Sequence, residues 1–184
     1  MNLVVRLIKT LVLALMARRI GLLDRSSVTY RVWPNDLDFN LHMNNGRYLT
    51  LMDLGRTDLM IRSGFARVAL ARRWMPVLAG ATIRYRRSLA PFQRFRLDSR
   101  LVGWDDRWLY LEQRFETMDG RPAASAMVRA VFLGGGRTIP TAEVVAAAGI
   151  APQSPVLPPD FAAWIASEDG GGREVSNGCW NALS

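Results

Sequence analysis

Residues 36–48 read DLDFNLHMNNGRY and separate a strand-like run from a helix-like run. They contain the only histidine of the chain, two carboxylates and three asparagines. Segments between regular elements present functional groups more often than the elements themselves, whose residues mainly serve packing. We therefore expect the polar chemistry of this protein to lie in residues 36–48.

The runs on either side of this segment predict a strand and then a helix. Residues 27–33 (SVTYRVW) alternate and are rich in β-forming side chains, which predicts the strand. Asn44 or Asn45 is a suitable N-cap for the helix, and Ser63-Gly64 would end it. Four residues recur at helical spacing, namely Tyr48, Met52, Gly55 and Leu59. Four polar residues lie off this stripe, namely Asp53, Arg56, Thr57 and Asp58.

Gly55 is unfavourable within such a helix, because glycine costs about 1 kcal/mol relative to alanine. A close approach of the helix to a sheet would explain its presence.

The rest of the chain supplies that sheet: residues 73–133 alternate between apolar and polar, with breaks at Ala90-Pro91, Asp105-Asp106 and Asp119-Gly120. One strand, one helix and four further strands predict an α+β domain in which a curved antiparallel sheet wraps a central helix.

We place this domain at residues 25–137, between an N-terminal amphipathic helix at 1–24 and a C-terminal extension at 138–184. The extension contains a short alanine-rich run at 141–148, which predicts a helix, and a proline-rich run at 152–159, which predicts an extended linker. The glycines at 170–172 and the residues after them predict a mobile tail.

The composition is that of one globular domain with a basic surface. The formal net charge is +8, and Lys9 is the only lysine, so the positive charge is almost entirely arginine. Arginine grips phosphate and carboxylate through two parallel hydrogen bonds. The charge therefore fits coenzyme A, an acidic carrier protein, an anionic membrane or nucleic acid, and equally a solvated surface. No nucleic-acid motif or metal-ligand cluster occurs, and the single cysteine excludes an internal disulfide.

Residues 2–20 are apolar except for a few polar positions, and Asn2, Arg6, Lys9 and Thr10 fall near one side of a helix. The wide apolar face suits a helix that packs on its own domain or a partner subunit, or one that lies on a membrane surface. A cleaved or spanning segment is the third alternative, although the apolar run is short for either. We expect a cytoplasmic protein, with peripheral contact to the inner membrane face left open.

The pattern D-x-D-x-N-x-H-M-N-N-x-x-Y at residues 36–48 resembles the active-site segment of hotdog-fold thioesterases. It is most similar to the acyl-ACP thioesterases and to small bacterial proteins related to hydroxybenzoyl-CoA thioesterase. The resemblance implies a hotdog fold, a homodimer or tetramer joined through its sheets, and an acyl pocket between subunits. It also implies hydrolysis of acyl-CoA or acyl-carrier protein with no metal or other cofactor.

The resemblance also assigns roles to residues. Asp38 matches the catalytic acid, acting as nucleophile or general base, and Asn40 and His42 match the residues that position or activate water. The oxyanion and substrate-binding set would be Asn44, Asn45 and Tyr48. Independently of the resemblance, the free N–H groups at a helix start near Asn45 are candidate oxyanion donors. Leu41 departs from many bacterial relatives, which have glycine there.

Two alternatives to hydrolysis remain at this point. The first is a hotdog protein that binds acyl thioesters or lipid without turnover and is held on a membrane by residues 2–20. A hotdog dehydratase is the second and weaker one, because that enzyme usually has a different histidine context. Arginines on neighbouring predicted strands would hold coenzyme A phosphates or face an acidic carrier protein, or be solvated: Arg84, Arg86, Arg87, Arg94, Arg96 and Arg100.

Overall fold

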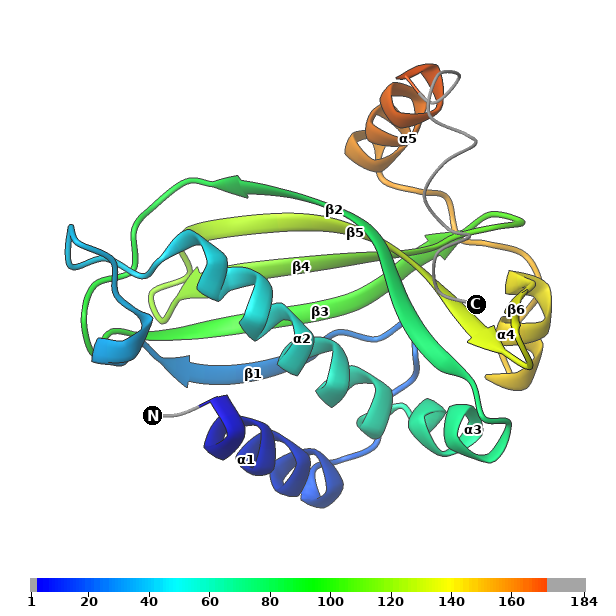
Figure 1. The fold of residues 1–184 in the computed structure, drawn as a ribbon, viewed down its shortest axis with the longest axis horizontal. Coiled ribbons are helices and arrows are strands. Elements are labelled where there is room, and N and C mark those ends of the chain that lie inside the picture. Colours follow the sequence, from blue (N-terminus) through cyan, green and yellow to red (C-terminus); the bar gives the residue numbers. More distant parts are fainter. Residues whose placement is uncertain (1–2, 172–184) are drawn as a thin grey trace.

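The computed structural model describes residues 3–171, in which an antiparallel sheet curves around one long helix (Figure 1). The strands are β1 (Ser26–Arg31), β2 (Met75–Tyr85), β3 (Arg94–Trp104), β4 (Leu109–Thr117), β5 (Pro122–Gly134) and β6 (Arg137–Ile139). The helices are α1 (Leu3–Met16), the 3₁₀ turn η1 (Pro34–Asp36), α2 (Asn45–Arg62), α3 (Phe65–Ala71), α4 (Thr141–Ala147) and α5 (Pro159–Gly171). The strand order is β1-β3-β4-β5-β2, with β6 paired to β5.

This architecture confirms the predicted α+β hotdog fold. The predicted strand, helix and four strands correspond to β1, α2 and β2–β5, and the structure adds α3 and β6. The central helix begins after Asn44, whose side chain accepts a hydrogen bond of 2.8 Å from the Gly46 N–H, and it ends before Ser63. Both ends therefore lie where the capping residues predict them.

The C-terminal extension contains more structure than the sequence predicts. Helix α5 occupies residues that carry no predicted element and extends into the predicted tail at 170–172. Phe161 and Trp164 on α5 are buried against Val102 and Tyr110 of the sheet. The helix is thus stabilised by two aromatic anchors rather than by a periodic apolar face. Residues 172–184, the remainder of the predicted tail, lie outside the described residues.

Helix α2 approaches the sheet closely at Gly55. A Cβ atom there would lie 2.6 Å from Ser99 Oγ and 2.9 Å from Leu97 Cδ2. Gln113 of β4, which is fully buried, donates hydrogen bonds to the Met52 carbonyl (2.9 Å) and to Ser99 Oγ (2.8 Å). The absent side chain at Gly55 therefore lets a sheet residue bond directly to the helix backbone.

Replacing this glycine tests the close approach. We expect Gly55→Ala to lower the free energy of unfolding by about 1–3 kcal/mol, because overpacking outweighs the gain in helix propensity. Urea denaturation followed by circular dichroism measures the change. An unchanged or raised midpoint would show that the helix and sheet move apart at little cost.

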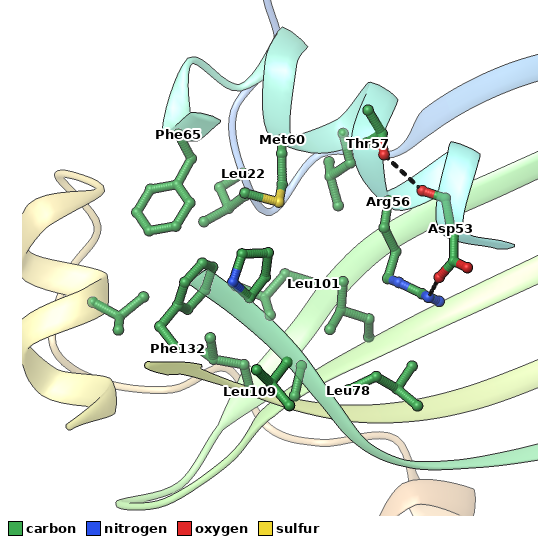
Figure 2. Close-up of a pocket in the computed structure, with 16 residues that line it drawn as sticks. Leu22, Asp53, Arg56, Thr57, Met60, Phe65, Leu78, Leu101, Leu109 and Phe132 are labelled. Carbon is green, nitrogen blue, oxygen red and sulfur yellow. Dashed lines mark hydrogen bonds and ion pairs between the residues drawn. The ribbon is translucent and has the colours of Figure 1, made fainter. Parts of the chain in front are cut away.

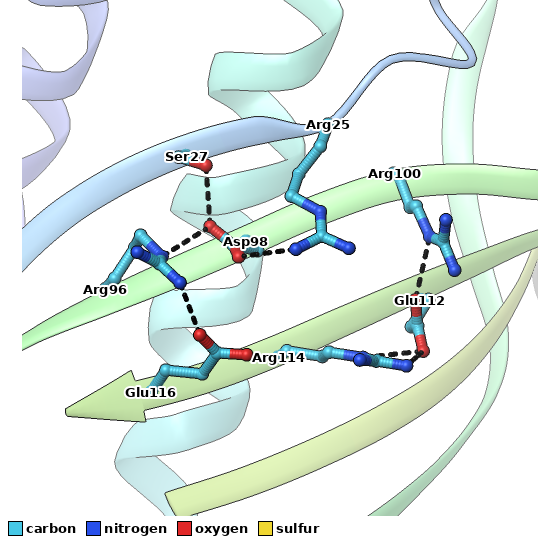
Figure 3. Close-up of polar contacts among 8 residues, drawn as sticks. All are labelled: Arg25, Ser27, Arg96, Asp98, Arg100, Glu112, Arg114 and Glu116. Atoms are coloured by element: carbon cyan, nitrogen blue, oxygen red, sulfur yellow. Dashed lines mark hydrogen bonds and ion pairs between the residues drawn. The ribbon is translucent and has the colours of Figure 1, made fainter. Parts of the chain in front are cut away.

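The outer face of the sheet carries a polar ladder (Figure 3). Arg96 lies opposite Glu116 and Arg100 opposite Glu112 in the β3–β4 register, and both are ion pairs. The Arg100–Glu112 distance is 2.8 Å. Each such pair contributes roughly 0.2–1 kcal/mol. Arg96 and Arg100 were among the arginines predicted to hold coenzyme A, to face a carrier protein or to be solvated. In the structure they form ion pairs with glutamates of the neighbouring strand.

Helix α1 docks on its own domain through its polar side, beside α2 and β1 (Figure 1). Arg6 and Thr10 are buried, and the Thr10 hydroxyl lies 2.9 Å from the Tyr30 hydroxyl. Burial raises the pKa of Tyr30 to about 12, so this phenol stays neutral. The inner side of α1 thus packs on its own domain, which is one of the predicted alternatives. Within residues 3–171, no helix has both the length and the apolar character to cross a bilayer.

Candidate active site

The segment before α2 is anchored by Asp36, which is almost fully buried. Its carboxylate accepts a hydrogen bond of 2.9 Å from the Trp33 N–H and forms an ion pair with Arg6 of α1. Arg47 of α2 approaches the same carboxylate at 3.4 Å. Asp36 therefore has a structural role, because its carboxylate links α1, η1 and α2.

Asp38 lies two residues further on and closes a tight turn over residues 38–42. Its Oδ1 accepts hydrogen bonds from the backbone N–H groups of Asn40 (2.9 Å) and His42 (3.2 Å). The Asp38 N–H in turn donates to the His42 carbonyl at 2.8 Å. Within residues 3–171 no hydrogen bond reaches Oδ2. The half-buried carboxylate is thus held by one oxygen and presents the other.

Leu41 adopts the left-handed backbone conformation within this turn, with φ of 57°. This conformation costs a residue with a Cβ roughly 1–2 kcal/mol and costs glycine little. The turn therefore follows a path suited to glycine even though this chain has leucine there.

We expect Leu41→Gly to raise the free energy of unfolding by roughly 0.5–1 kcal/mol, after the entropy that glycine adds to the unfolded chain. Phe39→Gly is the matched control, because Phe39 is exposed in the same turn without a positive φ. The control should instead lose roughly 0.5–1 kcal/mol. Thermal unfolding of both variants decides the matter, and equal losses would contradict the strain at Leu41.

The other side chains of the turn face solvent. Asn40 and His42 are exposed, and within the described part of the chain no hydrogen bond joins the His42 ring to Asp38. Phe39 is fully exposed and Leu41 is 65% exposed. Neighbouring exposed apolar side chains are typical of a surface that another molecule covers. The structure therefore brings Asp38, Asn40 and His42 into one turn, and within residues 3–171 no hydrogen bond joins their side chains to one another.

The start of α2 lies beside this turn. The Asn44 side chain caps the Gly46 N–H, whereas no acceptor within residues 3–171 reaches the Asn45 N–H. The Asn45 carbonyl accepts a hydrogen bond of 3.0 Å from the Tyr85 hydroxyl, which ties the helix start to the end of β2. Asn44 is thus a cap, and Asn45 supplies a free donor at the positive end of the helix dipole.

Tyr48, the last residue of the predicted oxyanion and substrate-binding set, is buried. Its side chain is 2% exposed and packs edge-on against Tyr85 and Phe115. Burial raises the pKa of the Tyr48 hydroxyl to about 12, although a hydrogen bond to the Leu89 backbone acts in the opposite direction. The structure therefore places Tyr48 in the core beneath the helix start.

A mainly apolar cavity of about 280 Å³ lies between the second half of α2 and the sheet (Figure 2). Its wall includes Met60 of α2, Phe65 of α3, Leu78 of β2, Leu101 of β3 and Phe132 of β5. None of its lining residues comes from the 38–42 turn. The cavity begins near Asp53, eight residues after Asn45, which is about 12 Å along the helix.

A polar group borders this cavity where α2 meets β4. Arg56 donates a hydrogen bond of 2.7 Å to Gln113 Oε1 and forms an ion pair with Asp53 (Figure 2). Burial lowers the pKa of the Arg56 guanidinium, and Asp53 opposes this shift. Sequence reasoning missed this group, because it placed the off-stripe residues of α2 away from the sheet. The signal was Gln113, which lies two residues from both Leu111 and Phe115. It therefore shares the inward face of the strand with these two apolar residues.

Comparison with known proteins places this fold in a family. The family model described as the thioesterase-like superfamily matches residues 32–165. The protein THEM6 of Xenopus laevis is 36% identical over 155 residues, which are 84% of this chain and 73% of that protein. A probable thioesterase of Saccharomyces cerevisiae is 27% identical over 119 residues, covering 64% of this chain and 51% of that protein.

Among solved structures, the probable thioesterase YbaW of Escherichia coli is similar to this chain. The two share a TM-score of 0.62 at 22% sequence identity, over 66% of this chain and 94% of YbaW. At that identity the likeness concerns the fold, and it agrees with the curved sheet around α2. The chain belongs to the thioesterase-like superfamily and has its hotdog fold.

Proposed function

We propose that this chain hydrolyses acyl thioesters, of coenzyme A or of an acyl-carrier protein, through Asp38 and without a metal. The placement of Asp38 carries this proposal. Its carboxylate is fixed through Oδ1 and leaves Oδ2 unbonded, close in sequence to the free Asn45 N–H at the start of α2. A carboxylate beside a positive helix end fits a reaction in which an oxyanion forms.

Hydrolysis converts a thioester and water into a carboxylic acid and a thiol. With Asp38 as general base, Oδ2 takes a proton from water and the water oxygen bonds to the carbonyl carbon. The C–S bond then breaks, and the proton passes from Asp38 to the leaving thiolate sulfur, which restores the carboxylate. With Asp38 as nucleophile, Oδ2 itself bonds to that carbon, the thiolate leaves, and water cleaves the resulting anhydride. In both courses the Asn45 N–H stabilises the carbonyl oxygen as its negative charge grows.

The open edge of the sheet explains how the turn and the distant cavity would serve one substrate. β2 is the last strand of the sheet and is largely exposed. Two copies joined antiparallel along β2 would place the Tyr85 end of one strand beside the Met75 end of the other. Tyr85 contacts the start of α2, and residues 76–78 line the cavity. Each site would therefore combine the turn of one subunit with the cavity of its partner.

Thiol release from a series of acyl-CoAs, from short to long and including aromatic acyl groups, tests the proposed activity. Turnover of any member supports hydrolysis and gives the chain preference. If coenzyme A esters are not cleaved, the same series on acyl-carrier protein follows. An acyl thioester that is retained but never cleaved would overturn hydrolysis in favour of the binding protein.

A further inference from the structure

Helix α1 is oriented opposite to a typical surface helix, whose apolar side faces the core. Its buried positions are Arg6, Thr10 and Ala14. Six apolar residues form the opposite side and are between 49% and 80% exposed: Val4, Val5, Ile8, Val12, Leu15 and Met16. We call these six the outer face of α1. Such a contiguous apolar surface marks a site of interaction.

This orientation is fixed by specific polar contacts. Arg6 forms the buried ion pair with Asp36, and its Nη2 also donates to the Arg31 carbonyl at 3.2 Å. Thr10 bonds to the Tyr30 hydroxyl one turn later. Rolling the helix to bury its outer face would break these contacts and take Arg6 away from the buried Asp36 carboxylate. The outer face therefore stays outside.

The surroundings of the outer face indicate what covers it. Lys9 is exposed at its border, and Arg18 and Arg19 are exposed just after the helix. No acidic residue occurs between residues 3 and 23. The face itself contains no aromatic residue, whereas centres of protein interfaces are enriched in aromatic residues. Aliphatic side chains bordered by cations match the acyl chains and anionic headgroups of a lipid surface.

We propose that α1 binds the surface of an anionic bilayer, lying in the plane of the headgroups with its outer face inserted. A helix in this position reaches roughly 5–10 Å into the boundary between headgroups and acyl chains, which suits its short length. The basic residues beside it add attraction that salt weakens. This proposal does not depend on hydrolysis, because none of these residues lies in the 38–42 turn or the cavity.

Sedimentation of the full chain with lipid vesicles tests it. We expect binding to equimolar phosphatidylglycerol and phosphatidylcholine, and weaker binding to phosphatidylcholine alone or at high salt. The double variant Ile8→Gln/Val12→Gln should lower the partition at least roughly tenfold, because two aliphatic side chains no longer leave water. The control Leu70→Gln/Val156→Gln alters two aliphatic residues elsewhere that are even more exposed, and it should bind like the wild type.

Three results would overturn the proposal. The first is a wild-type protein that stays in the supernatant with anionic vesicles, and the second is equal loss of binding in the control. The third is a lower mass of the Ile8→Gln/Val12→Gln variant by light scattering without a change in partition, which would assign the outer face to a second copy of this chain. Should that variant misfold, Lys9→Gln/Arg18→Gln/Arg19→Gln replaces it, and unchanged binding to anionic vesicles would then be decisive.

Discussion

Asp38→Asn should reduce thiol release at least about 100-fold while the protein remains folded. The amide oxygen of asparagine can still accept the N–H groups of Asn40 and His42, so the turn keeps its path. The amide can neither take a proton from water nor attack the carbonyl carbon effectively. The loss should therefore appear in kcat, because substrate binding does not need the negative charge. Steady-state kinetics on the best acyl-CoA measures it.

Asp106→Asn is the matched control, because Asp106 is an exposed carboxylate far along the chain from this turn. It should hydrolyse substrate at the wild-type rate. An Asp38→Asn protein with the wild-type thermal midpoint and full activity would remove Asp38 from the reaction. In that case the neighbouring His42 becomes the group to test.

Two inactive variants should restore each other's activity if each site spans two subunits. Val77→Phe narrows the cavity, so it should block long acyl chains and spare short ones. Asp38→Asn should block all of them. A heterodimer of the two variants has one site with both defects and one with neither, by two-fold symmetry. We expect it to cleave long-chain substrate at about half the wild-type rate.

Co-expression with two affinity tags and sequential purification gives this heterodimer free of both homodimers. Hydrolysis of short acyl-CoA by the Val77→Phe homodimer shows that the fold survives. If turn and cavity of the same chain form the site, both sites of the heterodimer are defective and no long-chain activity returns. A monomeric mass by light scattering would contradict the shared site as well.

Local patterns predicted the parts of this fold that depend on neighbouring residues. The cap at Asn44 and the end of α2 near Ser63 follow from residue type and spacing. Gly55 was informative because its cost within a helix demanded a compensating contact, which Ser99 and Gln113 provide. Tyr48 lies on the apolar stripe of α2 and is buried, as its spacing with Met52, Gly55 and Leu59 predicts.

The features that the sequence did not predict depend on distant segments. The cavity needs side chains from α2, α3, α4 and four strands, and no local pattern specifies the space left among them. The docked side of α1 depends on Asp36 and Tyr30, whereas helical periodicity alone only separates a polar side from an apolar one. Helix α5 depends on Val102 and Tyr110, which lie about fifty residues earlier in the chain.

Because Arg6 and Asp36 form an ion pair, the two sides of α1 should tolerate different amino-acid substitutions. On the inner side, a change at Arg6 removes an ion-pair partner from the buried Asp36 carboxylate, two residues before Asp38. Selection should therefore conserve Arg6 and Asp36 as a pair. On the outer side, one aliphatic residue can replace another with little effect on folding. Mutational drift in this helix should therefore be confined to one half of its circumference, and the start of the chain should evolve in step with the turn that follows β1.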